Sequence, residues 1–166
     1  DLLDRAVKAL KSGQEPDLEK PLHAGPELDL HVPALIPEDY MPDVHLRLVL
    51  YRRIAAADDA EAIGELEAEL IDRFGPLQPP TQHLFRVTRL KLRAATLGLK
   101  KLEVGPLGGV VEFLPDHRVD PKIVLKLVQK EAKTYRLDGP NKLRFTARNE
   151  SEDARCKAAD ALLATL

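Results

Sequence analysis

The chain has 166 residues, of which 44% are hydrophobic and 31% charged, and this balance is typical of a globular domain. Its formal net charge of −2 gives no overall attraction to nucleic acid, and no apolar run approaches the roughly 20 residues that span a bilayer. The single cysteine, Cys156, excludes an internal disulfide and is typical of a cytoplasmic protein.

The first 26 residues are expected to form an arm in front of the main domain. An apolar stripe over residues 2–10 has helical spacing, and Gly13 ends it. Residues 12–26 are polar and rich in Pro and Gly, which indicates a linker. Because the chain starts without Met and without a signal-peptide pattern, we interpret it as a fragment of a longer protein. The main domain is predicted at residues 27–166.

Two elements are predicted at the start of this domain. Residues 27–32 alternate between apolar and polar side chains, which predicts a half-buried strand. Several prolines then interrupt the chain until Asp43, a predicted N-cap for a helix that runs to about Ala57. In this helix the inward side chains are predicted to be Val44, Leu48, Tyr51 and Ile54, and the outward ones Arg47, Arg52 and Arg53.

The segment 58–80 carries the most informative pattern. One face of its predicted helix is apolar, and Gly75 followed by Pro76 ends the helix after Phe74. The other face carries a row of carboxylates at spacings of four, four and three residues. Such a row is either an ordinary solvated face or a surface that contacts a partner. We call it the acidic row; its members are Glu61, Glu65, Glu69 and Asp72.

Downstream, a long helix is predicted at 81–97, after which the hydrophobic period changes from 3.6 to 2. Strands at 99–104 and 110–114 flank a Gly-rich hairpin turn. A helix that starts at Pro121 with Ile123 and Leu127 inward, strands near 135–137 and 142–147, and a helix at 151–166 complete the chain. The predicted fold is therefore α+β, a small mixed sheet of four or five strands packed with about five helices.

The residues give little support for a catalytic site or a cofactor-binding site. No histidine has a second His or a Cys at metal-ligand spacing, so no metal site is expected. Cys156 lies in a predicted amphipathic helix without an activating environment, and the glycines near 105–109 are explained by the hairpin. The acidic row lies on one helix and lacks the convergence of several elements that an active site requires. We predict no enzyme activity and no cofactor.

A second charged surface follows the long helix. A basic stripe can bind a phosphate backbone, but aromatic residues for stacking on single strands do not accompany it. The alternatives are a nucleic-acid contact, a solvated face, or pairing with acidic residues of the same fold, and we favour the last two. We call this surface the basic stripe; it consists of Arg86, Arg89, Arg93 and Lys100.

Two motifs are distinctive: ALIPEDYMPDVHLRLVLYRRIA at Ala34–Ala55, and ELIDRFG at Glu69–Gly75. With several shorter segments, and in the right order, they resemble the C-terminal domain of the bacterial transcription-repair coupling factor family, Mfd. The predicted hairpin and closing strand also match, and the resemblance covers roughly residues 1–147. The shorter matching segments are GLKKL, GVVEF, YRLDG and KLRF at Gly98–Leu102, Gly109–Phe113, Tyr135–Gly139 and Lys142–Phe145.

The resemblance implies a regulatory domain without catalysis, in a protein whose ATP-driven DNA translocase lies upstream. In that family the domain docks on an N-terminal UvrB-like module of the same protein and hides the surface that recruits UvrA. Release is expected when the factor engages stalled RNA polymerase. By match to the ELIDRFG motif, Glu69 and Asp72 would be the docking carboxylates, and geometry alone adds Glu65. No DNA contact and no membrane contact by this domain are expected; the alternative is a nucleic-acid-binding accessory domain of a DNA translocase.

Overall fold

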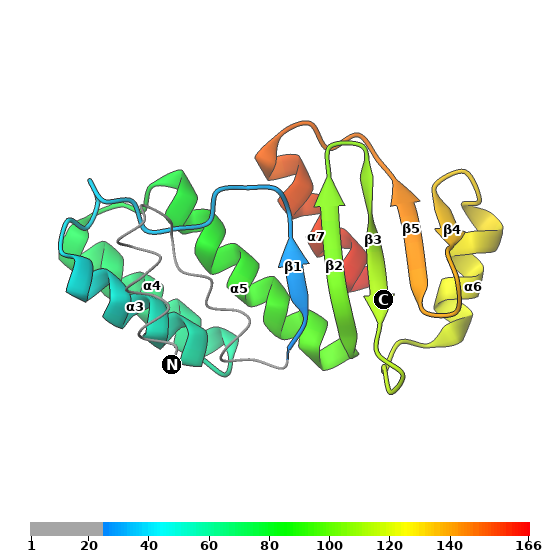
Figure 1. Ribbon diagram of the computed structural model, residues 1–166, viewed down its shortest axis with the longest axis horizontal. Helices are drawn as coiled ribbons and strands as arrows, with labels where there is room; N and C mark the ends of the chain where they lie inside the picture. The colour runs from blue at the N-terminus through cyan, green and yellow to red at the C-terminus, as the bar shows by residue number, and fades with distance from the viewer. Residues whose placement is uncertain (1–24) are drawn as a thin grey trace. The chain divides into compact units, whose positions relative to one another are not determined.

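The computed structural model describes residues 25–166, so the predicted helix of the arm and its linker up to residue 24 lie outside the described part. The domain boundary after residue 26 stays a prediction. The described residues form five helices and a five-stranded mixed sheet (Figure 1), which confirms the predicted α+β class. By their contacts they divide into two compact units, which we call unit 1 (Pro33–Arg89) and unit 2 (Gly25–Val32 with Leu90–Leu166). No helix in the described part is long and apolar enough to cross a membrane.

Unit 1 is helical. It contains α3 (Val44–Ala56), α4 (Ala60–Phe74) and the first part of α5 (Pro79–Leu97). Asp43 caps α3 as predicted, because its Oδ1 accepts a hydrogen bond from the Leu46 amide at 3.2 Å. Two tyrosines tie the irregular segment before α3 to the helices. The Tyr51 hydroxyl accepts from the Ile36 amide at 2.8 Å, and the Tyr40 hydroxyl donates to the Gly75 carbonyl at 2.8 Å.

The sides of α3 differ from the prediction at two positions. Arg47, predicted to point outward, is buried, and its Nη1 donates to the Met41 carbonyl at 3.1 Å. Arg47 can be buried because its aliphatic stem is apolar and its guanidinium has a carbonyl acceptor. Hydrophobic periodicity counts arginine as polar and therefore does not predict this burial. Val44, predicted inward, is exposed because it lies in the first turn, beyond the buried part of this face.

Unit 2 is built on the sheet, which runs in the order β1-β2-β3-β5-β4. The first pair is parallel and the other three pairs are antiparallel. Buried side chains alternate along the long strands, as in Leu102, Val104, Val111 and Leu143. The strands are β1 (Glu27–Asp29), β2 (Leu99–Gly105), β3 (Gly108–Phe113), β4 (Tyr135–Leu137) and β5 (Lys142–Thr146).

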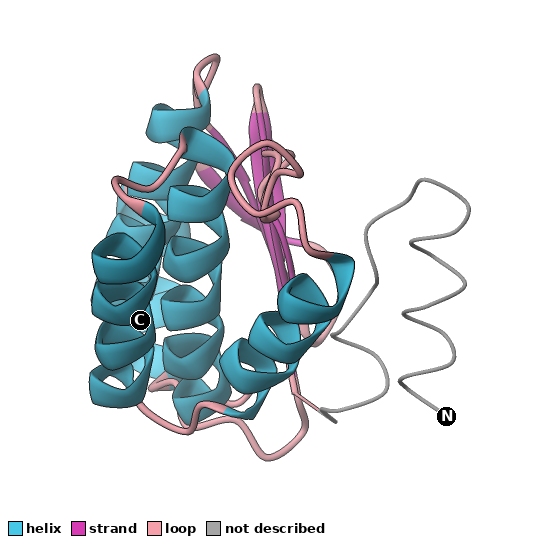
Figure 2. Cartoon of the chain, turned by 90° about the vertical axis from the view of Figure 1, so that its left-hand side faces the viewer, coloured by secondary structure: helices cyan, strands magenta, loops and turns pink. Residues whose placement is uncertain are grey.

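Helices cover one face of this sheet. In Figure 1, α7 (Glu152–Thr165) lies behind β2 and β3, and α6 (Pro121–Lys130) lies near β4. Figure 2 views the strands nearly edge on, with the helix that ends at the C-terminus to one side of them. Asp120 is the N-cap of α6 and Ser151 is the N-cap of α7. However, α6 buries no residue completely, so Ile123 and Leu127, predicted inward, are only half-buried.

The first strand is shorter than predicted. β1 ends at Asp29, whereas the alternating pattern extended to Val32. The reason is His31, whose φ of 53° lies in the left-handed region and turns the chain out of the extended conformation. The same turn brings the His31 amide to Oδ1 of Asp29, to which it donates at 2.9 Å.

Candidate functional site

The acidic row lies on α4, whose ends and apolar face are all held in place. Asp59 caps the helix by accepting from the Ala62 amide at 2.8 Å, and Gly75 ends it with a φ of 88°. On the inner face Ile63, Leu66 and Leu70 are buried. A short helix anchored in this way presents its outer side chains at fixed positions.

Within the row, Glu61, Glu65 and Asp72 are exposed and Glu69 is half-buried. The four carboxylates are therefore not equivalent. Glu69 is bound by Arg53 of α3 in a fork, with Oε2 to Nη1 at 2.6 Å and Oε1 to Nη2 at 3.1 Å. Arg73, one turn further along α4, approaches Oε2 of Glu69 to 3.7 Å. Glu69 thus joins α3 to α4 as well as forming part of the outer surface.

These contacts shift the protonation of the Glu69 carboxyl. The hydrogen bonds from Arg53, with the charges of Arg53 and Arg73, lower the pKa of Glu69 against a smaller effect of desolvation. The same hydrogen bonds raise the pKa of the Arg53 guanidinium. The pair is therefore ionised throughout the physiological range.

A pH-dependent stability follows from this lowered pKa. The ionised form stabilises the folded state fully above the ordinary value of 4.5, and this contribution is lost as the pH falls through the lowered folded-state pKa. Since the pair is partly exposed, Glu69→Gln should lower the free energy of unfolding by only about 0.2–1 kcal/mol at pH 6. Denaturant titrations should show the variant and the wild type converging below pH 4.5. Arg53→Gln should remove the same pH-dependent part of the free energy of unfolding. A stability difference between the variants and the wild type that does not change with pH would contradict this prediction.

A shallow groove of about 370 Å³ runs beside Glu69 between α3 and α4. Its lining combines small or apolar side chains with two carboxylates and one arginine. It could accommodate the aliphatic part of a basic side chain whose charged end meets a carboxylate. The lining residues are Arg53, Ala56, Ala57, Ala62, Glu65, Leu66 and Glu69.

The basic stripe forms ion pairs with carboxylates of the same unit. In unit 1, Arg89 donates to Glu67 at 3.0 Å. In unit 2, Arg93 donates to Asp160 at 2.7 Å, and Lys100 lies 3.5 Å from Glu112. Arg86 is half-buried on α5. These ion pairs favour the alternative in which the stripe is neutralised within the fold, because paired cations have less charge to offer a phosphate backbone.

The structure also brings together side chains that sequence spacing did not connect. Asp29 is the last residue of β1 and His31 lies two residues after it, and the parallel pairing of β1 with β2 places Glu103 beside them. The only sequence signal was the Asp-x-His spacing at 29–31, since Glu103 is distant in the chain. The spacing of histidines and cysteines does not predict this group, because it contains one histidine and two carboxylates.

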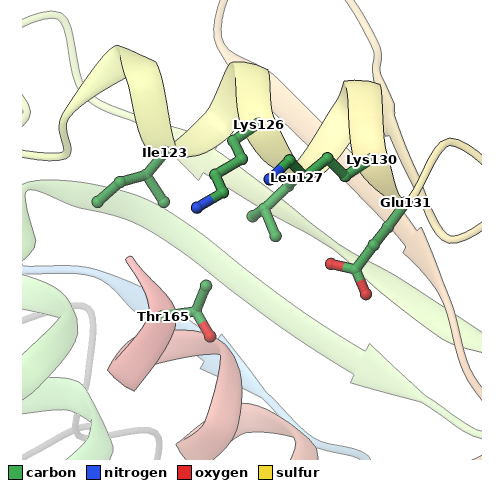
Figure 3. Close-up of a pocket in the computed structure, with 6 residues that line it drawn as sticks. All are labelled: Ile123, Lys126, Leu127, Lys130, Glu131 and Thr165. Carbon is green, nitrogen blue, oxygen red and sulfur yellow. The ribbon is translucent and has the colours of Figure 1, made fainter.

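Figure 3 shows a separate, mostly apolar pocket of about 410 Å³ in unit 2. Ile123 and Leu127 of α6 face the end of α7, which contributes Thr165. Its charged lining residues belong to α6 and to the residue directly after it. These residues do not form the converging polar set that chemistry requires. The charged residues are Lys126, Lys130 and Glu131.

Comparison with known proteins places this fold in a defined class. The model of the TRCF domain family matches residues 30–124, which is more than half of the chain. The chain therefore belongs to the TRCF domain family. A solved structure, the C-terminal domain of a transcription-repair coupling factor, superimposes with a TM-score of 0.68 at 20% sequence identity. It covers 85% of this chain and 93% of its own length, so the fold is shared.

Two similar proteins lead to the same family. The chain is 42% identical over 166 residues to the transcription-repair-coupling factor of Haemophilus influenzae, and 45% identical over 145 residues to that of Escherichia coli. The resemblance to the C-terminal domain of these factors is thereby confirmed. The chain spans 14% and 13% of the length of these two relatives.

Proposed function

We propose that this is a non-catalytic regulatory domain of a transcription-repair coupling factor, acting in bacterial transcription-coupled DNA repair. In this proposal α4 docks on the UvrB-like module of the same protein. Docking covers the surface through which that module recruits UvrA, and release follows when the factor engages stalled RNA polymerase. The observation that supports it most is the acidic row on a helix held at both ends and along its apolar face.

The row suits a reversible contact. Hydrogen-bonded charge pairs at a partly desolvated interface are each worth about 1–3 kcal/mol and weaken with salt. A latch made of a few such pairs can be opened by a competing partner that supplies a differential of a few kcal/mol. A large apolar interface would resist opening.

The contacts of Glu69 refine this proposal. Asp72 and Glu65 are exposed, whereas Glu69 is already held by Arg53 and Arg73. An incoming arginine would share Glu69 with Arg53 or replace it, and exchange of one exposed pair for another has a small net energy. Arg53 therefore keeps the Glu69 carboxylate oriented until docking. Asp72 and Glu65 can receive partner cations directly.

The test is binding of the chain, added in trans, to the isolated UvrB-like module at low and high salt. We expect salt-sensitive binding in the wild type and a loss of at least about tenfold in Glu69→Ala/Asp72→Ala, equivalent to about 1.4 kcal/mol. In the full-length protein the same change should raise UvrA binding. Stability should fall by less than about 1 kcal/mol, since these carboxylates are exposed or only half-buried.

Glu38→Ala/Asp58→Ala is a matched control, because it removes two exposed carboxylates of unit 1 that lie outside the row. It should leave both binding and UvrA recruitment unchanged. If the control weakened docking as much as the row variant, net charge rather than the row would be responsible. UvrA binding unaltered by Glu69→Ala/Asp72→Ala in the full-length protein would refute the latch.

A further inference from the structure

One group of potential metal ligands stands out among residues 25–166, and it lies apart from the acidic row. Asp29, His31 and Glu103 in unit 2 each direct one ligand atom toward the others, and these atoms all lie within 4.8 Å of one another. We propose that they form a binding site for one divalent transition-metal ion of the zinc class.

The two carboxylates are brought side by side by the backbone. Asp29 and Glu103 are register partners in the parallel pair β1–β2, so their side chains project from the same face of the sheet. Two like charges directly opposite each other on neighbouring strands are destabilising. A cation bound between the two carboxylates attracts both of them and so offsets their mutual repulsion.

His31 is held in a conformation that directs its ring to both carboxylates. With φ at 53° the chain turns back, and the His31 amide donates to Asp29 Oδ1 at 2.9 Å. On the other side the buried Arg155 donates to the His31 carbonyl at 3.1 Å. The ring nitrogen Nε2 then lies 3.4 Å from Glu103 Oε2 and 3.9 Å from Asp29 Oδ2.

These separations fit a small metal ion. Zinc binds nitrogen and oxygen ligands at about 2.0–2.2 Å in a tetrahedron, whose corners are then about 3.3–3.6 Å apart. The His31–Glu103 separation of 3.4 Å already has this value, and the Asp29–His31 separation of 3.9 Å exceeds it by a fraction of an ångström. Asp29 binds the His31 amide with Oδ1 and keeps Oδ2 for the metal, an arrangement that orients the carboxylate.

The donor set indicates the class of metal. An imidazole nitrogen is a poor partner for Mg²⁺ or Ca²⁺, which prefer oxygen-only sites, and a good one for zinc and its neighbours. Three protein ligands leave a fourth position for water. The side chains of Asp29, His31 and Glu103 are 49%, 47% and 35% exposed, so the ion can enter from solvent.

A metal here would fasten β1 to the sheet. β1 has three residues and pairs only with β2, so it is a short edge strand held by few backbone hydrogen bonds. Ligands from β1, from the turn after it and from β2 would be joined by one ion. Metal binding that requires the folded arrangement stabilises it by mass action.

The test is isothermal titration calorimetry of the chain with Zn²⁺ in a chelator-free buffer, with Mg²⁺ in a parallel titration. We expect one zinc per chain, no competition from equimolar Mg²⁺, and slower amide hydrogen exchange at Leu28 and Leu30 when zinc is present. Asp29→Asn, His31→Asn and Glu103→Gln should each weaken binding by about tenfold or more. Asparagine is chosen at position 31 because it tolerates a positive φ.

His45→Asn and Glu112→Gln serve as matched controls, since they remove a histidine and a strand carboxylate outside the group. They should leave zinc affinity unchanged. The site is refuted if His31→Asn binds zinc as the wild type does, or if millimolar zinc produces neither heat nor a change in hydrogen exchange at β1. The docking proposal concerns unit 1 and is unaffected by either outcome.

Discussion

Replacing Arg155 with methionine is expected to lower the free energy of unfolding by about 3–5 kcal/mol. Arg155 is buried on α7 and donates to the carbonyls of Leu30, His31, Asn149 and Glu150 at 2.9–3.1 Å. Methionine keeps most of the apolar stem but has no donor. Four carbonyl oxygens would then lose a charged partner in a buried place, and water can restore only some of these bonds.

Denaturant titration followed by circular dichroism measures this change, and hydrogen exchange localises it. Protection should be lost first at β1, because two of the four carbonyls belong to the chain directly after it. Lys157→Met, on the same helix with its side chain 72% exposed, is the matched control and should change stability by less than about 0.5 kcal/mol. A loss below about 1 kcal/mol for Arg155→Met would mean that this network is not what holds β1 to α7.

The second large effect is expected from Leu70→Ala on α4, which should cost about 3–4 kcal/mol. Leu70 is completely buried, and its carbonyl accepts from the Tyr40 hydroxyl at 3.3 Å. Removal of its side chain leaves a cavity under the C-terminal half of α4, where Glu69 and Asp72 lie. Docking on the UvrB-like module should weaken as well if α4 must be rigid to present Glu69 and Asp72 together.

Ile71→Ala is the control for this prediction, because the neighbouring side chain is of similar size but 45% exposed. It should change the free energy of unfolding by about 0.5 kcal/mol or less. Urea titrations of the two variants beside the wild type provide the comparison. Equal losses for Leu70→Ala and Ile71→Ala would contradict the assignment of the inner face of α4.

The local elements were predictable because their signals lie close together in the chain. The cap at Asp43, the left-handed stop at Gly75, the Asp120-Pro121 start and the cap at Ser151 are all short-range hydrogen-bonding or steric devices. Helical periodicity likewise predicted an apolar face on the helix of segment 58–80, and Ile63, Leu66 and Leu70 of that face are buried. The α+β class followed from the change of period after the long helix.

Other features depend on partners far away in the chain, which no local pattern contains. Arg47 is buried because the Met41 carbonyl is available to it, and β1 ends early because His31 turns back between Asp29 and Arg155. The strand order, with β1 parallel to β2 at one edge, follows from long-range pairing.

The candidate sites divide in the same way. Spacing along one helix was enough to group Glu61, Glu65, Glu69 and Asp72, since a helix sets their relative positions by itself. That Glu69 is held by Arg53 depended on the packing of α3 against α4. The meeting of Asp29, His31 and Glu103 required a parallel strand pair. The sequence alone thus determined the helices, their caps and the acidic row, because these depend on neighbours within a few residues. Only the tertiary structure decided which charges are paired and which ligands converge, because those contacts join residues that are distant along the chain.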